Sequence, residues 1–502
     1  MNEPDSWAIL RPWMLPAGGV LLMVCWALRC WLQRDPVLLT VGRVRFRIRE
    51  SFIPILITGS SGSGKSFALL EIIRSLLTQT PEGRKPGLLV FDGKNTLVRD
   101  VQAMVRHLGR EDDLVLLEVR PDGAQPVWQP KNVMNLLGKL PFSTSVGHLQ
   151  AAAAARSAHR EEEPFFVLAV QTLLIEVCKS IEVLGYDVTW ANVARALQKE
   201  DGLQNLIREL KELQIPLLDR AAREPEARGR LAKMGRIQRE LENFSAMPAG
   251  QLGGILASAK NWLATFANEE FAEVYSAAGS SFDLQESLDR GAIILVMTPA
   301  RFRRERKVVQ TLLKLEFYVA ARRRFEQPAE ELERKNIWSL IIDEAHSVLS
   351  SSEDSAGELE YLDTCRAARI VTAFATHGIA SIEAAVGSVQ SKVVAQNLPT
   401  RIFFRAADAA SADEASHFIG RHWVWKEDRT TSRHGGSFTR RKEQAPRVSP
   451  EALSALRDHQ AYVVKNSNGR KVRKTFVPPR GPDGKIPGWY WRKRIVALLW
   501  PF

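Results

Sequence analysis

A phosphate-binding loop is the feature that most constrains what this chain can fold into. Residues 59–66 read Gly-Ser-Ser-Gly-Ser-Gly-Lys-Ser, which fits the pattern G-x-x-x-x-G-K-[ST]. The apolar, β-branched run 53–58 precedes the loop, and residues 67–73 follow it with apolar side chains at helical spacing. A flexible Gly/Ser-rich linker would not have these flanks. The sequence therefore predicts a strand, a P-loop and a helix that bind nucleotide phosphates.

Each part of this loop has a predicted task. The glycines let backbone N–H groups turn toward the phosphates. Lys65 is predicted to reach the β- and γ-phosphates of ATP, and the Ser66 hydroxyl to ligate Mg²⁺. The predicted nucleotide-binding residues of the loop are Gly59, Ser60, Ser61, Gly62, Ser63, Gly64, Lys65, Ser66 and Phe67.

An acidic pair far downstream complements the P-loop. The apolar run 337–342 ends in Asp343 and Glu344, and the carboxyl end of a strand is where ligands bind in open α/β sheets. Such a pair alone is often only a solvated turn, but beside a complete P-loop it favours hydrolysis. Asp343 is predicted to support Mg²⁺, and Glu344 to activate the attacking water as general base. Asp92, at the end of the apolar run 87–91, is predicted to face the same crevice.

The alternation of strand and helix patterns predicts an α/β fold. We expect a RecA-like P-loop NTPase core with a mostly parallel sheet, because further buried-strand candidates follow at 289–297, 370–377 and 400–404. Only helical spacing occurs between residues 141 and 282, which predicts an all-helical insert. The predicted parts are a membrane anchor at 1–40, the nucleotide-binding domain at 41–140 and 283–478, the insert at 141–282, and a basic, aromatic tail at 479–502.

An apolar N-terminal run predicts a membrane helix. Residues 13–32 are interrupted by a charge only at Arg29, and about 20 such residues can cross a bilayer. Arginines follow the run, whereas Glu3, Asp5 and a lone Arg11 precede it, so the positive-inside rule places the N-terminus outside and the ATPase in the cytoplasm. Because the run is marginal in length, a buried or partner-bound apolar helix is the alternative.

Basic segments elsewhere add to a formal net charge of +12, which suits nucleic acid or anionic lipid but also fits a generally soluble basic surface. Residues 43–49 alternate arginine with apolar residues, as in a half-buried strand whose basic face meets solvent or lipid headgroups. Residues 421–447 interleave tryptophan with cations around two glycines. This pattern predicts a basic hairpin that grips a phosphate backbone, or equally a disordered loop. The tail 489–502 is typical of a membrane-surface helix or a docking peptide.

The order of these elements resembles that of the coupling proteins of type IV secretion, the TraG/TraD-type branch of the FtsK/HerA-like translocases. The likeness extends from about residue 13 to 478. Its generic parts are the P-loop and Asp343-Glu344. Phe91–Lys94 and the strand of Gly291 also match in family order. The more family-specific matches are Arg366–Arg369 before Ala375–His377, and Asn397–Ile402 before Asp408.

The resemblance implies a hexameric, ring-forming ATPase of the inner membrane that moves DNA toward a secretion channel, with relaxase and channel proteins as partners. In such rings a neighbour's arginine stabilises the charge on the γ-phosphate, and Arg366 and Arg369 are candidates, although surface arginines would have the same pattern. His377 stands where the family usually has a phosphate-sensing glutamine, and only one span is credible where two are usual. The predicted catalytic residues are Lys65, Glu344, Arg366 and His377.

Two other functions stay open at this point. One is a secretion ATPase that exports protein effectors, whose turnover DNA would not stimulate. The other is a nucleotide-gated recruitment receptor, in which binding docks the cargo and His377 leaves only weak hydrolysis.

Overall fold

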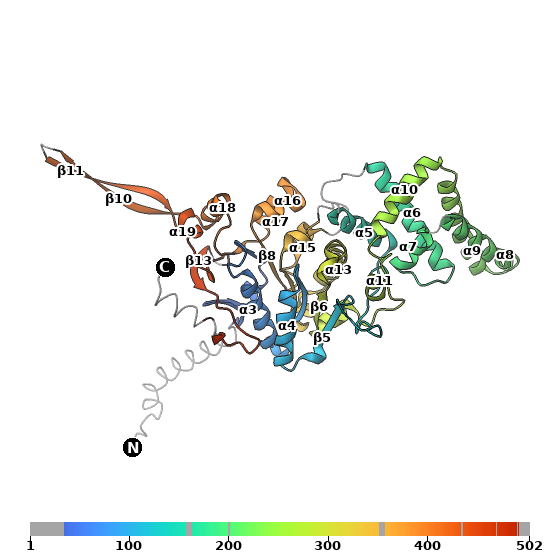
Figure 1. Ribbon diagram of the computed structural model, residues 1–502, viewed down its shortest axis with the longest axis horizontal. Helices are drawn as coiled ribbons and strands as arrows, with labels where there is room; N and C mark the ends of the chain where they lie inside the picture. The colour runs from blue at the N-terminus through green and yellow to red at the C-terminus, as the bar shows by residue number, and fades with distance from the viewer. Residues whose placement is uncertain are drawn as a thin grey trace, which may run out of the picture.

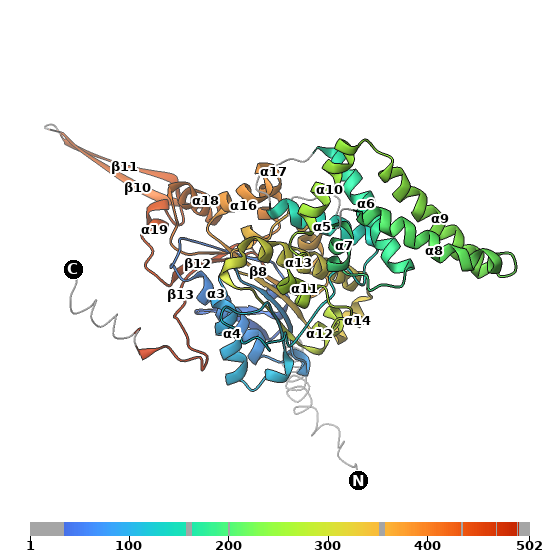
Figure 2. The same cartoon turned by 45° about the vertical axis from the view of Figure 1, so that its right-hand side comes forward.

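A computed structural model describes residues 35–156, 163–198, 201–350, 357–432, 435–467, 469–488 and 490. Figures 1 and 2 show a central α/β core with a helical lobe on one side and a long two-stranded ribbon on the other. The predicted membrane segment 13–32 and most of the predicted tail peptide lie outside the described residues.

A nine-stranded sheet forms the core, in the order β13-β12-β9-β3-β8-β7-β4-β6-β5. All neighbours from β9 to β5 are parallel, whereas β12 runs antiparallel to both β9 and β13. The α/β core with a mostly parallel sheet is therefore confirmed. The strands are β3 Ile55–Thr58, β4 Gly87–Phe91, β5 Leu114–Glu118, β6 Ile293–Met297, β7 Trp338–Ile342, β8 Ile370–Thr376, β9 Thr400–Phe403, β12 Gln460–Lys465 and β13 Lys471–Phe476.

The central strands are apolar throughout because helices cover both faces of the sheet. Ile55 and Ile57 of β3 pack with α3 and α4, whereas Leu56 packs into the core on the opposite face, which α13 covers. The helices of this core are α3 Lys65–Thr78, α4 Thr96–His107, α12 Leu284–Arg290, α13 Arg303–Phe325, α14 Ala329–Arg334, α15 Glu358–Thr364, α16 Ile379–Val386, α17 Ser388–Gln396, α18 Ala409–Ile419 and α19 Pro450–Ser454.

The described residues between 142 and 275 form helices and no strand. Helix α6 is the one helix in the described part of the chain that is long and apolar enough to cross a membrane, but here it packs against α5, α9 and α10. The helices of this lobe are α5 Phe142–Arg156, α6 Pro164–Val183, α7 Trp190–Gln198, α8 Gly202–Ala221, α9 Pro225–Ser245, α10 Ala249–Leu263 and α11 Glu269–Tyr275.

The strand predicted over residues 43–49 forms one arm of a separate hairpin. Strand β2, Val44–Arg47, pairs antiparallel with β1, Val37–Val41, and a short helix, α2 Ile48–Ser51, then leads to β3. Val44 and Phe46 are buried and Arg45 is exposed, as the period of two predicts. The strand therefore does not continue directly into the P-loop strand.

The segment predicted as a basic hairpin or a disordered loop forms the ribbon that projects from the core (Figure 1). Strands β10, Arg421–Ser432, and β11, Gly435–Pro446, pair antiparallel. Trp423 and Trp425 near the ribbon's base are exposed. The Lys442 ammonium lies 5.5 Å from the Trp423 ring centre, and the Arg440 guanidinium 4.9 Å from that of Trp425.

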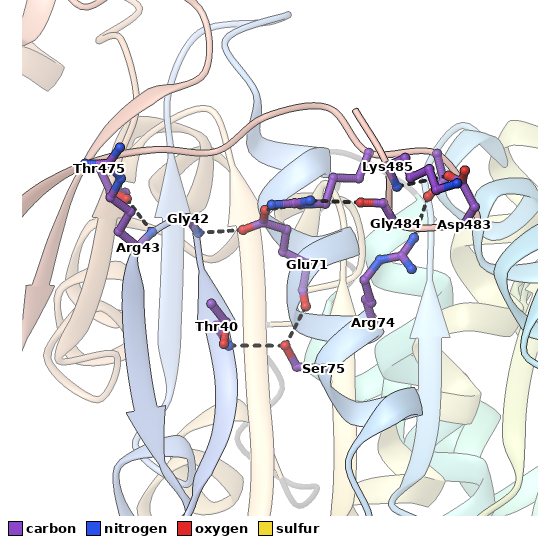
Figure 3. Close-up of polar contacts among 12 residues, drawn as sticks. Thr40, Gly42, Arg43, Glu71, Arg74, Ser75, Thr475, Asp483, Gly484 and Lys485 are labelled. Carbon is purple, nitrogen blue, oxygen red and sulfur yellow. Dashed lines mark hydrogen bonds and ion pairs between the residues drawn. The ribbon is translucent and has the colours of Figure 1, made fainter. Parts of the chain in front are cut away.

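The first part of the predicted tail lies along the P-loop helix α3 (Figure 3). Arg74 of α3 donates to the carbonyl of Pro482 at 3.1 Å, and Arg480 donates to the buried carboxylate of Glu71 at 3.2 Å. Glu71 also accepts the N–H of Gly42, in the β1–β2 turn, at 2.5 Å. One buried carboxylate thus joins the N-terminal hairpin, the P-loop helix and the C-terminal segment.

Candidate nucleotide site

The loop between β3 and α3 adopts a conformation that requires glycine. Gly59, Gly62 and Gly64 have φ values of 154°, 74° and 119°, which side chains disfavour. A Cβ on Gly59 would also come within 2.7 Å of the Phe404 Cβ, whereas one on Gly62 would meet nothing within 4 Å. Packing therefore adds to the backbone requirement at Gly59 but not at Gly62.

Three segments distant in the sequence fix the loop through its backbone. One segment follows β8, one follows β9 and one precedes β12. The sheet order places all three around the end of β3. The hydrogen bonds run from Gly59 N to His377 O at 3.2 Å, from Ser60 N to Arg405 O at 2.8 Å, and from His459 N to Ser63 O at 2.8 Å.

The Lys65 ammonium lies inside the loop. It donates to the carbonyls of Gly59 at 2.7 Å and Ser60 at 3.0 Å. Burial lowers the pKa of Lys65, while the nearby charge of Asp343 opposes that shift. The lysine is therefore held at the end of β3, where the phosphates of a nucleotide bind in a P-loop.

The structure brings Ser66 and Asp343 together. The Ser66 hydroxyl donates to the Asp343 carboxylate at 2.8 Å, and the Asp343 N–H donates to the carbonyl of Phe91 at 2.9 Å, beside β4. Burial raises the pKa of Asp343, and its hydrogen bond with Ser66 opposes the shift. Two hard oxygens at this spacing fit Mg²⁺, because cis ligands of an octahedral ion at ~2.0–2.1 Å are about 2.9 Å apart.

Glu344 adopts a strained backbone beside this pair. Its φ of 54° lies in the left-handed region, which is costly for a residue other than glycine and is often found at functional sites. The carboxylate forms an ion pair of 2.6 Å with Lys94. Burial opposes ionisation of Glu344, but the hydrogen bond from Lys94, with the positive charges around it, lowers the pKa of the carboxyl overall. The carboxylate is thus held ionised, as a general base requires.

Two histidines lie near Glu344 at the end of β8. The ring centres of His346 and His377 are 5.7 Å apart, and His346 Nδ1 lies 3.2 Å from the Thr376 hydroxyl. Burial lowers the pKa of His346, which favours its neutral form, although the Glu344 charge opposes that shift. The residue predicted in the usual glutamine position therefore lies at the P-loop, with a second imidazole next to it.

Asp92 lies nearby, but its carboxylate caps helix α4. It accepts the backbone N–H groups of Lys94 and Leu97, both at 2.7 Å, and is fully buried. Burial raises the pKa of Asp92 and these hydrogen bonds oppose the shift. Asp92 therefore follows β4 next to the strand end of Asp343, but its oxygens bind the backbone of the next helix, and a role for it toward the nucleotide stays a prediction.

Arg366 and Arg369 lie at the amino ends of the parallel strands, whereas the P-loop lies at their carboxyl ends. They precede β8, whose far end carries His377, and a seven-residue strand is ~20 Å long. Arg369 is held in place by hydrogen bonds to the Leu332 carbonyl at 3.0 Å and to Glu82 at 3.2 Å, whereas Arg366 is exposed. Neither arginine can therefore act in the nucleotide site of its own chain.

Sequence reasoning missed three contributions to this site. Lys94 was visible as part of the strand ending Phe91–Lys94, but nothing in the sequence indicated its ion pair with Glu344. His346 stands two residues after Glu344 and could have been noted from that spacing. His459 precedes β12, and only the position of this strand in the sheet brings it to the P-loop.

Comparisons with known proteins agree with this geometry. Residues 258–473 match the model of the type IV secretion-system coupling protein DNA-binding domain. The unbound monoclinic form of the bacterial conjugative coupling protein TrwBdeltaN70 is similar with a TM-score of 0.63 and 15% identity, covering 91% of each chain. The plasmid coupling protein TrwB with ADPNP is 14% identical, with a TM-score of 0.61 over 91% of this chain and 92% of that one.

A third solved structure, of TrwB with ADP and Mg²⁺, is 14% identical and has a TM-score of 0.60 over 90% of this chain and 92% of the other. No curated protein sequence matches the chain. The similarity to these structures establishes the shared fold, and the family match extends over the second half of the nucleotide-binding core.

Proposed function

We propose that this chain is a type IV secretion-system coupling protein and an ATPase that moves DNA toward a secretion channel, because residues 258–473 match the model of the DNA-binding domain of such proteins. The observation that carries the proposal is the contact between Ser66 and Asp343 at 2.8 Å, with Glu344 adjacent. This contact joins the P-loop and the acidic strand end into one cleft, which binding and hydrolysis of a nucleotide both require.

The residues of this cleft divide the chemistry among them. Backbone N–H groups of the loop and the Lys65 ammonium hold the phosphates and offset their charge. Ser66 and Asp343 would hold Mg²⁺, which when bound neutralises charge on the phosphate oxygens. The ionised Glu344 orients the attacking water and takes its proton. Lys94 must then release the carboxylate or share it with that water.

The arginine that completes such a site is proposed to come from a neighbouring subunit. Arg366 is exposed and precedes β8, at the end of the parallel strands opposite its own P-loop, so the residue can serve a nucleotide only across an interface. This arrangement supports a ring, and the family supports a hexamer. His377 is proposed to occupy the phosphate-sensing position, where neutral imidazole can donate one hydrogen bond to a phosphate oxygen.

DNA is the proposed cargo because the matched family is described as a DNA-binding domain. The exposed ribbon lies inside the matched range, and its tryptophans and cations suit a single-stranded backbone with stacked bases. The apolar run 13–32 is proposed to anchor the chain in the inner membrane with the ATPase in the cytoplasm. A relaxase and channel proteins are the proposed protein partners.

ATPase assays on the full chain with and without single- and double-stranded DNA test this function. We expect DNA to stimulate turnover, and Lys65→Ala and Glu344→Gln to lower it by about 10²-fold or more. Matched controls are Lys260→Ala and Glu240→Gln, which make the same changes at exposed positions of the helical lobe and should retain activity. Turnover that DNA does not change would favour a protein cargo. Nucleotide binding without turnover would favour a recruitment receptor.

A further inference from the structure

A basic groove lies between the β1–β2 hairpin and the C-terminal strands β12 and β13. Its volume is about 500 Å³. One wall is the outer face of β2, and the other is the face of β12 and β13 where Lys465 pairs with Lys471 and Val463 with Arg473. The charged residues that line it are Arg43, Arg45, Arg47, Lys465, Lys471, Arg473 and Glu50. The groove is therefore a concentrated positive site outside the nucleotide cleft.

The single carboxylate of the groove does not neutralise this charge. Glu50 is engaged by Lys465 at 2.5 Å, by the Ser467 hydroxyl at 2.7 Å and by the Arg47 backbone N–H at 3.0 Å. Within the described ranges, no carboxylate pairs with Arg45, Lys471 or Arg473. Several guanidinium and ammonium groups thus face one space with their hydrogen-bond capacity unused, which suits a phosphate-bearing ligand.

The two walls are fixed to each other. Arg43 donates its backbone N–H to the Thr475 hydroxyl of β13 at 2.9 Å (Figure 3), and Lys465 donates to the Arg45 carbonyl at 2.9 Å. Gly42 makes this approach possible, because a Cβ there would overlap the Phe476 carbonyl at 2.4 Å. The strands that carry the cations are therefore held close together by the fold, and their exposed basic side chains reach one shared space.

The groove lies next to the point where the apolar run ends. Arg47 donates to the Asp35 carbonyl at 3.2 Å, and Val37 lines the groove. Leu32 is the last residue of the run, and three residues span at most about 11 Å. The headgroup layer of a bilayer is about 5–8 Å deep on each side. If the run crosses the membrane, as the proposed function requires, the groove lies within reach of the headgroups.

We propose that this groove binds the phosphate headgroup of an anionic phospholipid. A lipid is favoured over nucleic acid because the groove is short and adjoins the membrane end of the chain, whereas a strand of nucleic acid needs an extended track. Basic segments next to a membrane helix gain affinity from the negative surface of the cytoplasmic leaflet. The bound headgroup would fix the hairpin, and through it the Glu71 contact to the P-loop helix, at the membrane surface.

Native mass spectrometry of the full chain in nonionic detergent tests this inference. The probes are soluble short-chain phosphatidylglycerol and, as the neutral comparison, short-chain phosphatidylcholine. We expect at least tenfold tighter binding of phosphatidylglycerol. The triple variant Arg45→Gln/Lys471→Gln/Arg473→Gln should lose this preference. The matched control, Arg230→Gln/Arg236→Gln/Arg239→Gln, removes three exposed charges from α9 and should retain it. Arg473→Gln alone, with an intermediate loss expected, serves if the triple variant does not fold.

Two competitors separate the sources of the phosphate group. Complete displacement of the lipid by inorganic phosphate at the same concentration would show a site for free anions only and would overturn the proposal. Tighter binding of a short oligonucleotide at the same residues would also overturn it. Equal binding of phosphatidylglycerol and phosphatidylcholine by the wild type would likewise overturn the proposal. The proposed membrane anchoring is checked separately, by stable incorporation of the chain into neutral lipid discs. A chain that is not anchored can therefore be distinguished from a groove that does not bind the anionic lipid.

Discussion

The Ser66 hydroxyl donates a hydrogen bond of 2.8 Å to Asp343, 277 positions away along the chain. If both side chains serve one Mg²⁺ ion, their effects on activity must be coupled. We expect Ser66→Ala and Asp343→Asn each to lower kcat/KM for MgATP at least tenfold. The fold-loss of kcat/KM in the double variant should be clearly smaller than the product of the two single fold-losses. The cycle is measured by steady-state kinetics over a range of Mg²⁺ concentrations. Fully multiplicative losses would show that the two residues act independently.

The ion pair of Lys94 with Glu344 predicts a pH effect. Lys94 helps to lower the pKa of Glu344, so its loss should raise that pKa. In Lys94→Met the general base would then be protonated at higher pH, and the acidic limb of the kcat/KM profile should move upward in pH. Lys85→Met is the control, because Lys85 pairs with Asp113 away from the cleft. An unshifted limb in Lys94→Met would mean that the pair does not persist in the working enzyme.

Two glycines of the P-loop should tolerate alanine differently. Gly59→Ala would place a Cβ 2.7 Å from Phe404 and 2.9 Å from the Ser63 hydroxyl, whereas at Gly62 the Cβ meets nothing within 4 Å. Both residues have positive φ, so Gly62→Ala carries only the backbone cost of about 1–2 kcal/mol. We expect Gly59→Ala to abolish nucleotide binding and Gly62→Ala to weaken it by about tenfold, as measured with a fluorescent ATP analogue. Equal losses would contradict this steric assignment.

The buried Glu71 should control how the C-terminal segment is held. Glu71→Leu removes the acceptor for Gly42 and Arg480, and leaving such donors without a partner costs about 1–3 kcal/mol. We expect trypsin to cleave this variant faster after Arg480 and Lys485, and mass spectrometry of the fragments measures the rate. Glu71→Gln keeps an acceptor oxygen and should be cleaved almost as slowly as the wild type. Unchanged cleavage in Glu71→Leu would show that this carboxylate does not hold the segment.

The same residue predicts a difference in pH dependence. Because burial raises the pKa of Glu71 above its ordinary value of 4.5, the folded state holds that proton more tightly than the unfolded chain does. The stabilisation from this group is complete below pH 4.5 and is lost as pH rises through the folded pKa. The thermal midpoint of Glu71→Gln should therefore rise relative to that of the wild type as the pH increases above about 4.5.

Much of the core could be predicted because its strands are buried on both faces. β4 and β8 are continuous apolar runs bounded by turns, and the strand ends that carry Lys65 and Asp343 follow from the motifs. Strand β5 was missed although it is as long as β4 and nearly as apolar; it lies at the sheet edge, where most of its residues are only partly buried. Strand β13 was missed because Lys, Arg and Thr interrupt its pattern, and β12 was missed because its apolar run, 461–464, is only four residues long.

Relations between distant segments could not be predicted. The sequence indicated Arg366 as a catalytic candidate, but only the direction of β8 shows that this arginine lies away from its own P-loop. The tail was expected to be separate, whereas Arg480 binds a carboxylate whose burial depends on the packing of three segments. Such outcomes follow from sheet order, which local periodicity does not determine.

The position of β3 in the sheet has a consequence for synthesis of the protein. This strand pairs only with β8 and β9, which follow it by about 300 residues, and ribosomes add roughly 5–20 residues per second. The apolar edges of the strand therefore remain without partners for about 15–60 s while the helical lobe is translated. During that interval these apolar edges are open to aggregation, and the cleft between the P-loop and Asp343 is completed only near the end of translation.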